Sequence, residues 1–229
     1  MATTVKAIYL DVGGPLVDDS GLDEYWNEHL LRTLPGLIGR EVTLEEIETA
    51  NRQSIRSYTP SLYSGTIWRL VQPDKEKFKV LRADFDRLDL SQFFKLRPEA
   101  EEVLSELSMK YTLAIAANQP QSTADFLERH GIMKHFAFRQ MSGELPYSKP
   151  DFRFFIYIAD QLGIPLTESV MVGDRQDNDI APAKRLRMRA VRYLTGSHRE
   201  QEVRMPNEMP DCQIKSLKEL PRAINDLLS

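Results

Sequence analysis

The chain has 229 residues, 41% of them hydrophobic and 28% charged, which is ordinary for one large globular domain or a core with an inserted subdomain. Its net charge is −4, and neither a basic surface for nucleic acid nor an acidic tail is indicated. No run approaches the ~18 apolar residues of a membrane span, and the N-terminus lacks a signal-peptide pattern. The single cysteine, Cys212, fits a reducing compartment. We therefore expect a cytoplasmic protein.

The first apolar run, residues 5–10, predicts a β-strand that delivers one carboxylate, Asp11, into a Gly-Gly-Pro turn that begins at Gly13. A charge at the end of a buried strand is costly unless it is used. Residues 20–91 then hold helical patterns and no convincing strand. We expect an all-helical cap in this insert, with its ends at the edge where Asp11 lies, so that it could cover a site there.

The remainder of the chain alternates short strands with amphipathic helices. The predicted strands are residues 111–117, 170–172, 189–193 and, more weakly, 212–214, and the predicted helices lie around residues 100–107, 120–131 and 155–162. This alternation predicts a mainly parallel sheet with helices on both faces. The expected fold is therefore α/β, with a Rossmann-like core formed by residues 1–19 and 92–229 and a helical cap formed by residues 20–91.

A second apolar run, residues 170–172, is followed by Gly173 and then by an aspartate, Asp174. Right-handed crossovers place the C-terminal ends of parallel strands on one edge, so Asp11 and Asp174 should meet there. Two adjacent carboxylates repel, and a bound divalent cation is the simplest relief. The alternative is two solvated aspartates without a function. The four histidines have no metal-ligand spacing, and we expect them at the surface or at helix ends.

These motifs together resemble those of the haloacid dehalogenase-like (HAD) hydrolase superfamily. Residues 11–16, Asp-Val-Gly-Gly-Pro-Leu, resemble its first motif, Asp-x-Asp-Gly-Thr-Leu. Residues 114–118, Ala-Ile-Ala-Ala-Asn, stand in the place of the second, and Lys149 with the following proline resembles the third. Residues 173–179, Gly-Asp-Arg-Gln-Asp-Asn-Asp, resemble the fourth, Gly-Asp-x-x-x-Asn-Asp. The likeness runs in order and spacing over nearly the whole chain.

The resemblance implies a phosphatase-like site. In that family the first aspartate, here Asp11, attacks phosphorus and forms an aspartyl-phosphate. Mg²⁺ would be held by Asp11, Asp174 and the backbone carbonyl of Gly13, which any side chain at that position would leave intact. Lys149 would act in catalysis by offsetting the charge of the carboxylates and of the bound phosphate.

The same resemblance assigns supporting roles. Asp179, together with Asn178, would orient Lys149 or a metal-bound water. Ala117 and Asn118 stand where the family binds phosphate through a Ser or Thr hydroxyl, with Asn118 offering an amide or its backbone N–H instead. The implied partner is a small phosphorylated molecule, with no nucleic acid and no membrane. The pattern specifies no oligomeric state.

Two departures from the family leave alternatives open. Gly13 stands where the family carries the aspartate that protonates the leaving group and later activates water, a role worth ~10²–10⁴-fold in rate. Ala117 lacks the phosphate-binding hydroxyl. The favoured interpretation is a Mg²⁺-dependent phosphohydrolase weakened by Gly13. The others are a HAD enzyme of different chemistry, such as a 2-haloacid dehalogenase, and a catalytically poor protein that binds or regulates.

Overall fold

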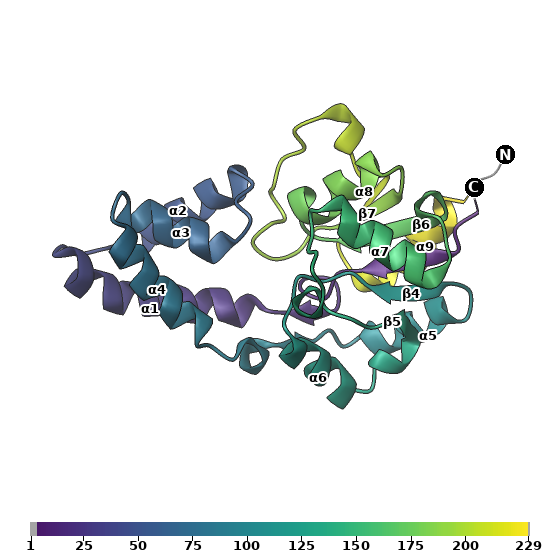
Figure 1. Ribbon diagram of the computed structural model, residues 1–229, viewed down its shortest axis with the longest axis horizontal. Coiled ribbons are helices and arrows are strands. Elements are labelled where there is room, and N and C mark those ends of the chain that lie inside the picture. The colour runs from purple at the N-terminus through teal and green to yellow at the C-terminus, as the bar shows by residue number, and fades with distance from the viewer. Residues whose placement is uncertain (1–3, 229) are drawn as a thin grey trace. The chain divides into compact units, whose positions relative to one another are not determined.

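The computed structural model describes residues 4–228, which form two compact units (Figure 1). One unit contains the chain up to residue 19 and from residue 94 onward, and the other is Ser20–Phe93. No helix among the described residues is both long enough and apolar enough to cross a bilayer.

The first unit is built on a six-stranded sheet. Its strands are β1 (Ala7–Leu10), β4 (Thr112–Ile115), β5 (Phe136–Phe138), β6 (Ser169–Gly173), β7 (Arg189–Tyr193) and β8 (Cys212–Ile214). Their spatial order is β5-β4-β1-β6-β7-β8, and all neighbours pair in parallel. Numbered along the chain within the sheet, this is the order 3-2-1-4-5-6 of a doubly wound fold. The expected α/β, Rossmann-like core is confirmed, and the order reverses between β1 and β6.

Helices cover this sheet. They are α5 (Ala100–Ser108), α6 (Gln121–Arg129), α7 (Phe152–Leu162), α8 (Ala181–Arg185) and α9 (Leu220–Asp226). Tyr9 and Met171 share a buried cluster with Phe154 and Ile158 of α7. The alternate residues of β1, such as Ile8, are equally buried, as a parallel strand covered on both faces requires. Short helical turns are η2 (Met133–His135), η3 (Ser142–Glu144), η4 (Leu166–Glu168), η6 (Pro206–Glu208), η7 (Leu217–Glu219) and the π-helix η5 (Gln176–Ile180).

A small hairpin, residues 12–18, follows β1 and reverses the direction of the chain. The carbonyl of Val12 accepts hydrogen bonds from Leu16 N (3.0 Å) and Val17 N (2.9 Å), and Gly14 N donates to Val17 O (2.9 Å). Strand β2 (Val17–Asp18) then pairs antiparallel with β3 (Lys95–Leu96). These bonds give the segment between Asp11 and residue 19 a fixed path.

The second unit is all-helical. Its elements are α1 (Ser20–Ile38), α2 (Leu44–Arg56), α3 (Leu62–Val71), α4 (Lys75–Asp86) and η1 (Leu90–Phe93). Trp26, Ile67 and Leu81 belong to its buried core. Helix α2 begins with a capping box in which Thr43 and Glu46 exchange side-chain and backbone hydrogen bonds. Hydrophobic periodicity in the insert predicts helices over residues 22–34, 44–58 and 75–88, so helix α3 was not predicted.

Candidate active site

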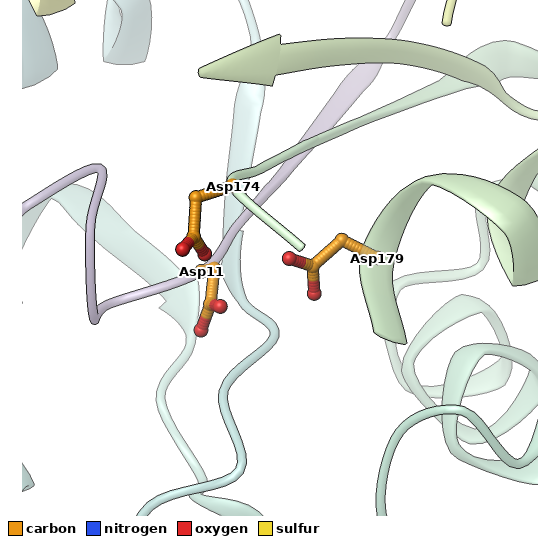
Figure 2. Close-up of side chains that lie close together, drawn as sticks. All are labelled: Asp11, Asp174 and Asp179. Carbon is orange, nitrogen blue, oxygen red and sulfur yellow. The ribbon is translucent and has the colours of Figure 1, made fainter. Parts of the chain in front are cut away.

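Three carboxylates gather where the strand order reverses. Asp11 directly follows β1 and Asp174 directly follows β6, and Asp11 N donates to Val172 O at 2.9 Å, which joins the two strand ends. Asp179 comes from η5 (Figure 2). One oxygen from each of the three carboxylates lies within 4.8 Å of the others, and each residue is less than a tenth exposed. This is the edge at which doubly wound sheets bind ligands.

The turn after β6 brings Asp179 back over the strand end. A Cβ atom on Gly173 would overlap the Asp179 carboxyl group, so only glycine permits this approach. Asp179 Oδ2 accepts a hydrogen bond from Arg175 N at 3.0 Å. The π-helical geometry of the turn is of a kind that recurs at functional sites. Asn178 is buried in the same turn.

Lys149 is the cation of the cluster. Its Nζ lies 2.6 Å from Asp179 Oδ1 and 3.0 Å from Asp11 Oδ2, and the residue is 3% exposed. Burial by itself would lower the pKa of Lys149, but the charges of Asp11 and Asp179 outweigh burial and raise it above its usual value. The lysine is therefore charged, and it holds two of the three carboxylates together.

Asn118 fixes the backbone of Lys149 from the end of β4. Its Oδ1 accepts from Lys149 N at 2.8 Å, and its Nδ2 donates to Lys149 O at 2.7 Å. Both ends of the Asn118 side-chain amide are thus engaged by the backbone of Lys149. Ala117 is fully buried, and its carbonyl accepts from Ser142 N at 3.1 Å.

One ammonium does not balance three buried carboxylates. Burial, followed by the charges of Asp179, Asp11 and Asp19, raises the pKa of Asp174 well above its usual range. Burial and the charge of Asp11 raise the pKa of Asp179 to about 6, although Lys149 opposes the shift. Clustered carboxylate oxygens with surplus negative charge are the donor set that hard divalent cations prefer. The residues present therefore fit a magnesium-type ion.

A histidine that the sequence did not single out also lies in this cluster. His198 Nδ1 is 3.9 Å from Asp174 Oδ2, and the side chain is 14% exposed, so a surface or helix-end position was the wrong expectation for His198. Burial and the nearby charge of Arg175 lower its pKa to about 3, so the ring is neutral. Its backbone carbonyl accepts from the buried guanidinium of Arg192 at 2.9 Å. Arg192 was the one indication in the sequence that this loop lies close to the sheet. A charged side chain inside a predicted buried strand needs hydrogen-bond acceptors, and the His198 carbonyl is one of them.

The loop that carries His198 is attached to the turn after β6 by buried amides. Gln201 Oε1 accepts from Gln176 N at 2.8 Å, and Gln176 Nε2 donates to Glu208 O at 2.8 Å. Arg175 forms an ion pair with Asp177 at 2.7 Å within the same turn. The guanidinium of Arg175 is thus bound to Asp177, while its backbone N–H serves Asp179.

A doubly wound sheet with an acidic cluster at its switch point is an arrangement of α/β enzymes. The model of one family, haloacid dehalogenase-like hydrolase, matches residues 5–187. The chain belongs to this family, and the resemblance inferred from its motifs is confirmed. It is a hydrolase by family.

Curated relatives and solved structures agree with this membership. A glyceraldehyde 3-phosphate phosphatase of Methanopyrus kandleri is 26% identical over 97% of this chain and 98% of its own length. The protein of the same name from Methanocaldococcus jannaschii is 40% identical over 44% of this chain and 43% of its own length. The crystal structure of a HAD phosphatase from Thermococcus onnurineus covers 96% of this chain and 98% of its own, with a TM-score of 0.67 and 23% identity.

Proposed function

We propose that this protein is a Mg²⁺-dependent phosphohydrolase that acts on a small phosphorylated metabolite through an aspartyl-phosphate on Asp11. The observation that carries the proposal is the oriented carboxylate of Asp11. Its Oδ1 accepts a hydrogen bond from Val12 N at 2.8 Å, and its Oδ2 lies 3.0 Å from the ammonium of Lys149. A carboxylate is a weak nucleophile, so fixed orientation and charge compensation must supply much of the rate.

The roles in this proposal follow from the chemistry of the groups. A carboxylate oxygen of Asp11 attacks phosphorus, and Lys149 offsets the negative charge that substrate brings to the cluster. Asp11, Asp174 and the carbonyl of Gly13 would hold Mg²⁺, which when bound neutralises charge on the carboxylates and the transferring phosphoryl group. Asp179, with its turn neighbour Asn178, keeps Lys149 in place.

The comparisons support a phosphate ester as the substrate class. Besides the two glyceraldehyde 3-phosphate phosphatases, the relatives include a phosphoserine phosphatase of Thermus thermophilus and phosphoglycolate phosphatases of two Vibrio species. A solved hydrolase of Deinococcus radiodurans with TM-score 0.69 contains bound phosphate and sodium. We propose that Ser20–Phe93 acts as the cap that selects among such substrates.

The direct test is hydrolysis of p-nitrophenyl phosphate with Mg²⁺ by wild type and by Asp11→Asn. We expect wild-type turnover and a loss of at least ~10³-fold in the variant, because the nucleophile has been removed. Asp125→Asn is the matched control, since Asp125 is an exposed aspartate of α6. It should retain wild-type activity. Wild type without turnover, or Asp11→Asn with undiminished turnover, would refute the proposal.

Gly13 and Ala117 favour one second candidate, a binding protein that retains the metal site without efficient catalysis. This candidate predicts no turnover of p-nitrophenyl phosphate together with calorimetric binding of Mg²⁺ and inorganic phosphate. A dehalogenase would instead release chloride from 2-chloropropionate without added metal. The same enzyme preparations separate all three.

A further inference from the structure

The backbone does not account for the glycine at position 13. Gly14, the next residue, has φ +85° and lies against the Asp174 side chain, so glycine is required there. Gly13 has no such positive φ, and its backbone would accept any L residue. The absence of a side chain at position 13 therefore calls for a different explanation, which lies in the space around it.

Two polar side chains occupy that space. A Cβ atom built on Gly13 would lie 3.2 Å from Asp19 Oδ2 and 3.6 Å from Gln119 Nε2. The first distance is shorter than an ordinary van der Waals contact, so Asp19 would have to shift by a few tenths of an ångström to admit a Cβ atom at position 13. The glycine and the Asp19 carboxylate are thus complementary in volume.

Local structure holds both polar groups where they are. Asp19 directly follows β2. The hydrogen bonds of the hairpin bring β2 close to Gly13, and a β-bridge pairs Gly13 with Val17. Thr123 Oγ1 lies 3.3 Å from Gln119 Oε1, a contact that directs the amide nitrogen of Gln119 the other way. The charge of Asp19 also acts on Asp174, where it is one of the causes of the raised pKa. Asp19 therefore lies near enough to Asp174 for the two charges to interact.

We propose that Asp19 performs the proton transfers for which Gly13 has no side chain. This inference rests on the proposed phosphohydrolase function. As an Asp11 oxygen bonds to phosphorus, the bond from phosphorus to the leaving oxygen breaks. That oxygen keeps the electron pair and takes the proton of the Asp19 carboxyl group. In the second half, Asp19 accepts a proton from water as the water oxygen bonds to phosphorus. The bond from phosphorus to Asp11 then breaks, which releases inorganic phosphate and restores both carboxyl groups.

Two substrates distinguish proton transfer from other roles. β-Glycerol phosphate has an alkoxide leaving group that needs a proton, whereas p-nitrophenolate leaves without one. For Asp19→Asn we expect kcat with β-glycerol phosphate to fall ~10²–10³-fold. With p-nitrophenyl phosphate we expect a rapid burst of one equivalent of p-nitrophenolate followed by slow turnover, because water activation is lost while phosphoryl transfer persists.

Asp18→Asn is the matched control, since it makes the same chemical change one residue earlier, in β2. It should behave as wild type with both substrates. The decisive variant combines Gly13→Asp with Asp19→Ala, which returns the carboxylate to position 13 and vacates the space around it. We expect this pair to recover β-glycerol phosphate turnover to within ~10-fold of wild type. Gly13→Asp alone should give no more turnover than wild type, because its side chain crowds Asp19.

Calorimetric titration with Mg²⁺ tests whether Asp19 is a metal ligand. We expect Asp19→Asn to bind Mg²⁺ with the affinity of wild type. A p-nitrophenyl phosphate reaction without the burst of p-nitrophenolate, a loss of Mg²⁺ affinity, or activity equal to that of Asp18→Asn would each overturn the assignment of Asp19 and leave the proposed function standing. Failure of the proposed function is distinguishable, because it appears in the unmodified protein as absence of turnover on both substrates. The inference about Asp19 then falls with it.

Discussion

Asp11 and Asp174 end adjacent parallel strands, yet the protein treats their charges differently. Asp11 is met by the ammonium of Lys149 at 3.0 Å and by a backbone N–H. Asp174 lies among other carboxylates, and the ring nitrogen of His198 at 3.9 Å is neutral. One carboxylate is compensated by the chain itself, whereas the other has its charge opposed by burial. The difference indicates which side of the cluster an external cation would stabilise.

The largest expected effect comes from removing the internal cation. Lys149→Met keeps much of the volume but leaves Asp11 and Asp179 buried without their partner, which should cost about 3–5 kcal/mol of unfolding free energy. Urea denaturation measures this loss. Lys134→Met is the control, because Lys134 pairs with Glu101 at the surface and should change stability by less than about 1 kcal/mol. Equal effects of the two substitutions would contradict the distinction between them.

Asp174→Asn should instead increase the unfolding free energy of the metal-free protein. The folded-state pKa of Asp174 is above its unfolded value, so the ionised group destabilises the metal-free protein at pH 7, and a neutral amide removes that penalty. In EDTA the variant should unfold at a higher urea concentration than wild type. Added Mg²⁺ should stabilise wild type by about 2.7 kcal/mol at 100 times its Kd, and the variant by much less. A variant less stable than wild type in EDTA would contradict the comparison.

The smallest effect is a change in pH dependence in the metal-free protein. The pKa of His198 is lowered to about 3, so the unfolded state binds the extra proton and stability is lost as pH falls from about 6.5 toward 3. The pKa of Asp179 is raised to about 6, which makes stability fall as pH rises from about 4 to 6. His198→Gln removes only the first contribution.

The unfolding free energy of His198→Gln minus that of wild type should therefore be larger at pH 4 than at pH 7. This difference should change by up to about 1.4 kcal/mol per pH unit. Urea midpoints across this range measure the difference. His130→Gln, the same change in the histidine at the C-terminal end of α6, is the matched control. A parallel pH profile for His198→Gln and wild type would show that His198 titrates normally.

Strand-end rules predicted the centre of the site from sequence. Asp11 and Asp174 follow apolar runs of a parallel sheet, and such runs must end on one edge, so the convergence of these two residues needed no side-chain geometry. Lys149 followed from its motif. Asn118 was predicted to bind phosphate, and its two hydrogen bonds to the Lys149 backbone were not foreseen, because they depend on a loop path that no periodicity encodes.

Residues brought in by loops were not predictable in the same way. His198 reaches Asp174 because Gln176 and Gln201 tie its loop to the turn after β6, and these are long-range contacts between polar residues. Asp19 reaches position 13 through the hairpin after β1 and through β2, a strand of two residues that pairs with the equally short β3. Elements so short carry no hydrophobic pattern.

The hairpin after β1 also bears on how such chains are classified. Because it folds residue 19 back beside residue 13, one region of space can receive a carboxylate from either position. An alignment compares residues at equivalent sequence positions, so it would count Gly13 as the loss of the catalytic acid. It would not detect a carboxylate that another residue brings to the same region of space. A chain of this family with glycine at this position should therefore be examined for an acid at the end of the hairpin.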